Sequence, residues 1–137
     1  MLLKDKKEIE AWLKQYSIKN YELIEDDEYG YVVNTISDIY LNFQNLYKME
    51  IKFNEINGNF SCNNNKLNLE SLKYLPKEII SDYIDLFDNK ELGNLQTMTN
   101  LKLLKKELKE IFQIQDDKNN LLKELPLKNK NKTISKI

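Results

Sequence analysis

Clustered carboxylates are the first feature of this 137-residue sequence that could do chemistry. Four acidic residues follow one another at Glu25–Glu28, and hard cations such as Ca²⁺ bind clustered carboxylate oxygens. The run lacks the alternating Asp-x-Asp-x-Asp-Gly spacing of a calcium-binding loop. A solvated hairpin tip explains it more simply, and we expect neither a metal ion nor a cofactor.

Three aspartates at intervals of three residues form a second acidic group, Asp82, Asp85 and Asp88. On a helix, this spacing would place them one turn apart, as a ridge that could bind a basic partner. Ordinary solvent-facing charge is the alternative interpretation. We include these three residues among the candidate partner-binding residues.

Lysines gather toward the C-terminal end and suggest a nucleic-acid-binding patch as an alternative function. Residues 1–100 carry 11 lysines and 17 acidic residues, a net charge of −6, whereas residues 101–137 carry 10 lysines and 5 acidic residues, a net charge of +5. Glu107 and Glu110 reduce the positive charge among the lysines of residues 102–109, and no aromatic residue lies among the lysines of residues 128–136. The lysines of this patch are Lys102, Lys105, Lys106, Lys109, Lys128, Lys130, Lys132 and Lys136.

Missing residue types argue against most kinds of catalysis. The sequence has no histidine, which removes the commonest general base, the Ser-His-Asp triad and most zinc sites. It has no arginine either, because all 21 basic residues are lysine, and it therefore lacks the bidentate group that clamps phosphate and reads guanine. We expect a protein that is not an enzyme.

Composition predicts a cytoplasmic protein. A content of 41% hydrophobic and 31% charged residues is typical of globular domains. No apolar run approaches the ~20 residues that span a bilayer, and the N-terminal segment turns charged at Lys4, unlike a secretory signal peptide. The single cysteine, Cys62, excludes an internal disulfide.

The first predicted element is a capping helix within residues 1–18. Asp5 and Glu8 have the spacing of a capping box. Apolar residues then recur at helical intervals, and we expect this stripe, including the only tryptophan, to face a core. The stripe consists of Ile9, Trp12, Leu13 and Tyr16.

Extended segments are predicted over residues 19–75. Tyr21–Ile24 and Tyr31–Val33 flank an acidic loop and suggest a hairpin, and two further strands are expected at Ile39–Leu41 and Asn59–Cys62. Tyrosines on an outer strand face would make good interface anchors. The tyrosines that we propose as partner-binding residues are Tyr29, Tyr31, Tyr40 and Tyr47.

The apolar period changes to 3.6 residues from about residue 76, which favours helices over residues 76–126. One helical stripe consists of Ile79, Ile80, Tyr83, Ile84 and Phe87, and a second of Leu101, Leu104, Leu108, Ile111 and Phe112. We expect the polar run of residues 115–120 to interrupt the second helix, and residues 127–137 to form a frayed lysine-rich tail.

The first half of the chain resembles bacterial and phage proteins with degenerate leucine-rich repeats. The resemblance rests on Ile9–Lys14, Ile18–Tyr21 and Ile51–Leu67, with a weaker copy at Ile39–Leu46. Its most specific part is Gly-x-Phe-x-Cys-x-x-Asn-x-Leu at Gly58–Leu67. The family opens with a short helix and a hairpin, followed by repeats of about twenty residues, and Ile39 and Phe60 are 21 residues apart.

The resemblance implies structural roles for several residues. Alternate apolar residues of each short strand would face inward, and Asn65 would satisfy backbone groups at the turn. Cys62 would then be a packed, inert core residue. The residues to which the resemblance gives such roles are Trp12, Gly58, Phe60, Cys62, Asn65 and Leu67.

A third repeat is where the match weakens. Asp85 would take the inward place that Cys62 holds in the preceding copy, unless a one-residue bulge turned Ile84 and Leu86 inward. The helical stripe needs no such adjustment, and we favour a helix there. The alternative, a further repeat strand within residues 77–90, stays open.

These patterns predict a mixed α/β (α+β) protein with a single domain over residues 1–126. It would comprise a capping helix (1–18), a hairpin with a small leucine-rich-repeat-like sheet (19–75) and a helical C-terminal half (76–126). The expected function is non-catalytic recognition of another protein. One concrete version is a phage or mobile-element inhibitor of a host defence protein, such as an anti-CRISPR. Besides nucleic-acid binding, a structural module that oligomerises through the Leu101–Phe112 stripe is the remaining alternative.

Overall fold

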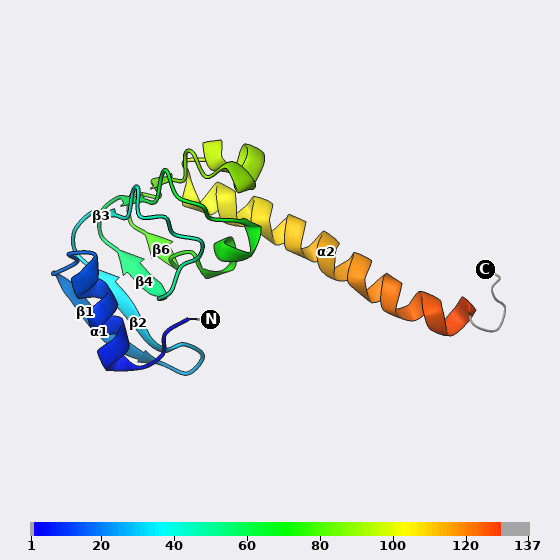
Figure 1. The fold of residues 1–137 in the computed structure, drawn as a ribbon, viewed down its shortest axis with the longest axis horizontal. Coiled ribbons are helices and arrows are strands. Elements are labelled where there is room, and N and C mark those ends of the chain that lie inside the picture. The colour runs from blue at the N-terminus through cyan, green and yellow to red at the C-terminus, as the bar shows by residue number, and fades with distance from the viewer. Residues whose placement is uncertain (1, 130–137) are drawn as a thin grey trace. The chain divides into compact units, whose positions relative to one another are not determined.

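The computed structural model describes residues 2–129, and the side chains of residues 2–122. It confirms a mixed α+β protein with an N-terminal and a C-terminal helix (Figure 1). The elements are α1 (Lys6–Gln15), β1 (Tyr21–Asp26), β2 (Gly30–Thr35), β3 (Ile39–Tyr40), β4 (Phe53–Ile56), β5 (Phe60–Ser61), η1 (Leu69–Tyr74), β6 (Glu78–Ile79), β7 (Ile84–Asp85), η2 (Lys90–Thr97) and α2 (Leu101–Asn129).

The N-terminal part forms as the sequence predicts. The Asp5 side chain accepts a hydrogen bond from the Glu8 backbone N–H and caps α1. Strands β1 and β2 then pair antiparallel, with Tyr21 opposite Thr35. The Asp26 carboxylate accepts hydrogen bonds from the backbone N–H groups of Glu28 and Tyr29, so one member of the acidic run shapes the hairpin turn.

Beyond the hairpin, the chain winds into three successive coils, each of which adds one strand to each of two sheets. The first sheet has the order β1-β2-β4-β6 and the second the order β3-β5-β7, and all pairs other than β1–β2 are parallel. Thr35, Ile56 and Ile79 align across the first sheet, and we number coils 1, 2 and 3 from these residues. Ile39, Phe60 and Ile84 align across the second sheet.

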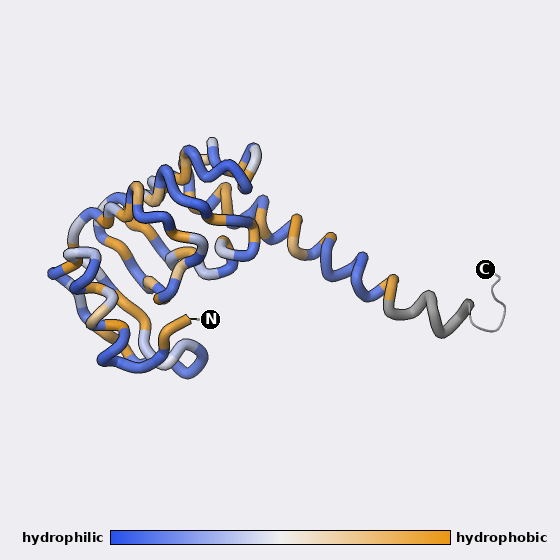
Figure 2. The backbone as a smooth tube through the Cα atoms, in the orientation of Figure 1, coloured by the Kyte–Doolittle hydropathy of each residue, from blue (hydrophilic) through white to orange (hydrophobic). Residues whose placement is uncertain are grey.

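The core lies between these strands and α1. Phe53 and Phe60 are fully buried, with ring centroids 5.9 Å apart, and Trp12 packs edge-on against Phe53 at 6.4 Å. Hydrophobic residues alternate with hydrophilic ones along much of the chain (Figure 2), and two apolar residues in and just after each strand of the second sheet are buried. They are Ile39 and Leu41 in coil 1, Phe60 and Cys62 in coil 2, and Ile84 and Leu86 in coil 3.

The predicted helix over Ile79–Phe87 is wrong, because these residues form β6, β7 and the turn between them. Three residues separate Ile56 from Phe60 in coil 2, but four separate Ile79 from Ile84 in coil 3. The extra residue lies in a turn where Asp82 has a φ of 60°, and it brings Ile84 and Leu86 into the core. The alternative that we left open, a further repeat strand reached by a one-residue irregularity, is therefore what forms.

Helix α2 differs from its prediction because it runs without interruption through residues 115–120, where we expected a break. The first compact unit of the chain ends at Leu104, inside α2. The apolar side chains of α2 become largely exposed after Leu108. The expected tail over 127–137 lies outside the described residues from residue 130 onward.

The free edge of the second sheet is closed by the segment that leads into α2. The Ile84 N–H donates to the Thr99 carbonyl oxygen at 3.2 Å, and the Leu101 N–H donates to the Asp82 carbonyl oxygen at 2.8 Å. Asn100 bridges to Tyr83 in an antiparallel arrangement. These bonds pair the outward N–H group of Ile84 in β7 and the carbonyl oxygen of Asp82 just before it, so neither group is open to another strand.

Candidate functional site

A buried asparagine holds coils 1 and 2 together. The Asn65 side-chain oxygen accepts hydrogen bonds from the backbone N–H groups of Gln44 and Leu46, both at 3.0 Å. Its Nδ2 donates to the carbonyl oxygens of Leu41, Cys62 and Asn63. Asn65 therefore satisfies backbone groups that would otherwise be buried and unpaired, the role that the sequence pattern gave it.

Asn89 has the same role one coil later, and the sequence analysis assigned it none. Its oxygen accepts from the Leu67 N–H at 3.0 Å, and its Nδ2 donates to the carbonyl oxygens of Cys62 and Leu86. The signal was present, because Asn89 follows Ile84 and Leu86 at the spacing by which Asn65 follows Phe60 and Cys62. This spacing was overlooked because we predicted a helix for the segment that contains Ile84 and Leu86.

The buried side chains on this side of the coils are structural. Cys62 is fully buried, and burial, with the negative charge of Asp85 as a smaller cause, raises the pKa of its thiol. A neutral buried thiol is a poor nucleophile. Position 58 requires glycine because the backbone of coil 1 passes close to it: a Cβ at Gly58 would lie 2.7 Å from the Ser37 carbonyl carbon.

Polar side chains on the outer face of the second sheet bond mainly to one another. The Asn42 oxygen accepts from the Ser61 hydroxyl at 2.7 Å and from the Asn63 N–H at 2.9 Å. The Asp85 carboxylate accepts from the Asn63 amide at 2.8 Å and lies 3.3 Å from the Ser61 hydroxyl, which has a single hydrogen and is closer to Asn42. This network connects the three coils and leaves Asp85 half-buried, so much of its bonding capacity is used within the protein.

Four exposed aromatic side chains come from the two coils on either side of coil 2, and we call them the aromatic surface. Tyr40, Phe43 and Tyr47 come from coil 1 and Phe87 from coil 3; their exposed fractions are 61%, 75%, 63% and 61%. The Tyr40 hydroxyl donates to the Asp38 carboxylate at 3.0 Å, and this hydrogen bond raises the pKa of Tyr40. Coils 1 and 3 flank coil 2, so their strands are about 10 Å apart, within reach of one partner.

Phe43 stands at a backbone position that disfavours it. Phe43, Asn64 and Asp88 occupy equivalent places after the strands of coils 1, 2 and 3, and their φ values are 58°, 55° and 58°. Asn and Asp tolerate this left-handed conformation, whereas a side chain such as Phe incurs a steric cost of roughly 1 kcal/mol. Coil 1 therefore carries an exposed aromatic ring where coils 2 and 3 carry the residue types that suit the turn.

A hollow of about 570 Å³ adjoins the aromatic surface at Tyr47. The Lys66 ammonium lies 5.4 Å from the centre of the Tyr47 ring, and the Asn64 amide donates to the Asp88 carboxylate at 2.6 Å. The hollow thus offers an aromatic face, amides and both signs of charge. Its walls consist of Asn45, Tyr47, Asn64, Asn65, Lys66, Asn68, Asp88, Lys90 and Glu91.

The structure brings together four of the seven residues predicted to bind a partner. Tyr40 and Asp85 lie on the second sheet, and Tyr47 and Asp88 line the adjoining hollow. Tyr29 and Tyr31 lie instead on the β1–β2 hairpin and are half-buried, and Lys52 sits 5.5 Å from the Tyr29 ring centre.

Asp82 faces a different neighbour, because its carboxylate pairs with the Lys102 ammonium at 3.4 Å. The three aspartates do not form a helical ridge, since they lie on a turn, a strand and a second turn. Sequence reasoning missed Phe87, which it placed on an apolar helical stripe, and gave Phe43 no role in binding.

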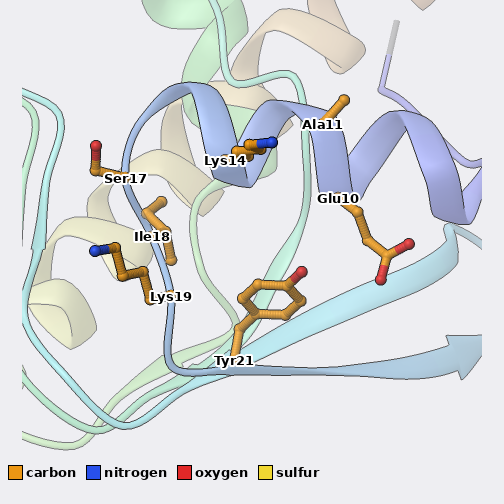
Figure 3. Close-up of a pocket in the computed structure, with 7 residues that line it drawn as sticks. All are labelled: Glu10, Ala11, Lys14, Ser17, Ile18, Lys19 and Tyr21. Carbon is orange, nitrogen blue, oxygen red and sulfur yellow. The ribbon is translucent and has the colours of Figure 1, made fainter.

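A second hollow, of about 470 Å³, lies between the end of α1 and the start of β1 (Figure 3). In that view, Tyr21 lies below the helix and Glu10 and Lys14 project from it. Its walls mix two exposed lysines, Lys14 and Lys19, with the Glu10 carboxylate, so it presents no single charge to a ligand.

Within residues 2–129, no cluster of three or more acidic or cysteine side chains is arranged to hold a metal ion. None of the helices in that range is both long and apolar enough to cross a bilayer. Comparison with protein families, curated proteins and solved structures finds no match to this chain.

Proposed function

We propose that this protein is a non-catalytic recognition module that binds another protein through the aromatic surface. The observation that carries the proposal is Phe43, a 75% exposed ring on a left-handed backbone. Strained residues persist where the surrounding structure enforces them, and they concentrate at functional sites. An exposed ring gains little by burial within the chain, so a contact with a partner is what would offset the strain.

The neighbouring residues support this proposal. Large aromatic side chains dominate the energetics of protein interfaces, because each buries much area at a small cost in side-chain entropy. The polar network of Asn42, Ser61 and Asp85 is bonded within the chain and needs little rearrangement on binding. A partner would therefore meet a preorganised surface that combines aromatic anchors with a polar centre bonded within the chain.

The coils themselves suit such a role. We infer that they are degenerate leucine-rich repeats, on the grounds of their spacing, their parallel strands and the asparagines Asn65 and Asn89. A cytoplasmic location agrees with the single, buried cysteine. The version of the proposal to test first is a stoichiometric inhibitor of a host defence protein, since such inhibition needs a binding surface and no catalytic group.

The experiment is a pull-down from the native host with the wild-type protein and two single variants as bait. The variants are Phe43→Asn and Tyr40→Ala, which change exposed side chains and leave the buried network in place. A partner captured by the wild type should be depleted at least tenfold with each variant. Equal capture by all three baits would refute the proposal that the aromatic surface is the interface.

A further inference from the structure

The C-terminal part of α2 exposes an apolar face that no role assigned above explains. Ile114, Leu121 and Leu122 are 65%, 56% and 58% exposed. This part of the helix also contains residues of low helix propensity, at Asp116–Asp117 and Asn119–Asn120. Most helical stability in proteins comes from packing of an apolar face, so a helix of this composition calls for a partner on that face.

The spacing along this face is that of a coiled coil. Ile111, Gln115, Lys118 and Leu122 follow one another at intervals of four, three and four residues, which are the alternating a and d positions of a heptad. Ile114 and Leu121 are seven residues apart and lie beside this seam. We call Ile111, Gln115, Lys118 and Leu122 the α2 seam.

The order of residues in the seam is symmetric about its midpoint. An apolar residue stands at each end, and the polar residues Gln115 and Lys118 stand on either side of Asp116–Asp117. If two copies pair antiparallel about the point between residues 116 and 117, Ile111 meets Leu122 of the second copy, and Gln115 meets Lys118 of the second copy. The twofold axis repeats both contacts, as an isologous interface requires.

We propose that the α2 seam pairs antiparallel with the α2 seam of a second copy of this chain. Polar complementarity selects this orientation, since the Lys118 ammonium can donate to the Gln115 side-chain oxygen of the second copy. A parallel pair would place Lys118 against Lys118, with like charges at the interface. In the antiparallel pair the two apolar layers also enclose the polar ones, and Ile114 lies near Leu121 of the second copy.

This proposal is independent of the recognition function, because the seam and the aromatic surface share no residue. It also differs from oligomerisation through Leu101–Phe112. Leu101, Leu104 and Leu108 are buried in the chain itself and are not available to a second copy. The seam contains only two apolar layers, so the dimer should be weak and should dissociate on dilution.

The first experiment measures the mass of the full-length protein by light scattering over a range of concentrations. The mass should rise with concentration toward twice that of the chain, and Leu122→Lys should weaken the dimer at least tenfold. Leu103→Lys is the matched control, because Leu103 is 59% exposed on the same helix but lies outside the seam. A wild-type protein that stays monomeric up to millimolar concentration, or equal effects of the two variants, would overturn the proposal.

The second experiment tests the orientation through Gln115→Glu. In the antiparallel pair, each new carboxylate meets the Lys118 ammonium of the second copy, and the dimer should tighten about fivefold through two exposed ion pairs. In a parallel pair, the two new carboxylates would face each other, and the dimer should weaken. Tightening supports the antiparallel seam, and weakening or no change contradicts it.

A disulfide test gives the register directly. Gln115→Cys protein mixed with Lys118→Cys protein should form an intermolecular disulfide under mild oxidation, whereas neither variant should do so efficiently alone. Rapid linkage of either variant to itself would show a parallel pair instead. Cys62 is fully buried and will not compete in the folded protein.

Discussion

Asn65 and Asn89 donate to the same backbone oxygen: their Nδ2 atoms lie 2.9 and 3.0 Å from the carbonyl oxygen of Cys62. One acceptor in coil 2 is therefore shared by the turn asparagines of coils 2 and 3. Each asparagine also binds a carbonyl oxygen of its own or the preceding coil. The coils are thus linked by side-chain amides at the place where strand pairing ends.

Replacing Asn65 should therefore be far more costly than replacing its neighbours. Asn65→Ala removes the partner of the part-buried Gln44 N–H and leaves buried backbone groups of Leu46 and Leu41 without that amide, which should lower the free energy of unfolding by about 3 kcal/mol. Asn63→Ala and Asn64→Ala remove more exposed bonds and should cost about 1 kcal/mol each. Urea unfolding measures all three, and equal losses would show that the shared acceptor does not hold the coils together.

The stability of the fold around α1 should depend on the packing of the Trp12 ring and not on its indole N–H group. Trp12 is buried against Phe53, but its indole N–H has no hydrogen-bond partner among the residues that the structure describes. Trp12→Ala should cost about 3–5 kcal/mol, because a large cavity remains. Trp12→Phe keeps an aromatic contact and removes a buried unsatisfied donor, so its loss should be about 1–2 kcal/mol. Thermal unfolding compares the two, and an unchanged melting temperature in Trp12→Ala would contradict the packing.

The thiol of Cys62 should report global unfolding. It is fully buried, and its raised pKa keeps it protonated at neutral pH, whereas the thiolate is the reactive form. Raising the pH from 7 to 9 would speed alkylation of an exposed cysteine, but in the native protein the rate should follow the unfolded population instead. The measurement is iodoacetamide labelling at several urea concentrations. Fast labelling without denaturant would contradict this account.

Sequence patterns predicted the first coils well because their local signals agree. The capping residues of α1, the hairpin loop and the spacing of Phe60, Cys62 and Asn65 each point to the structure that forms. In this part of the chain, the local conformational preferences of the residues agree with the fold as a whole, and Asn65 stands at the turn that its side chain suits.

Residues 79–87 were mistaken for a helix because two short strands and a four-residue turn reproduce a helical spacing of apolar residues. Only Ile79 and Ile84 of that stripe are buried, whereas Ile80, Tyr83 and Phe87 are exposed. Periodicity cannot tell these cases apart over so few residues. The same error concealed the role of Phe87 in the aromatic surface, since Phe87 was assigned to an apolar helical stripe.

The lysine-rich end should not determine binding to the partner. Deleting residues 127–137 removes four lysines but leaves Tyr40, Phe43 and Tyr47 in place. Affinity for a partner of the aromatic surface should change by less than about threefold, or ~0.7 kcal/mol. Binding to a random DNA duplex, measured at two salt concentrations by fluorescence anisotropy, provides the contrast. Tight, steeply salt-dependent duplex binding that vanishes with the deletion would favour the nucleic-acid alternative.

Phe43→Asn separates stability from binding most directly. Asparagine suits the left-handed backbone that coils 2 and 3 already show at Asn64 and Asp88, so the free energy of unfolding should rise by about 1 kcal/mol. The melting temperature should rise by about 3–5 °C. Affinity for the partner should fall at least tenfold, because an exposed anchor is lost.

Phe87→Asn is the matched control: it removes a similarly exposed ring from a residue without positive φ, and should weaken binding without raising stability. Calorimetry of both variants, with titration against the captured partner, checks these outcomes. If the Phe43→Asn protein is more stable and binds the partner as tightly as the wild type, the strained ring has no role in binding. That result would refute the proposal that the aromatic surface is the interface.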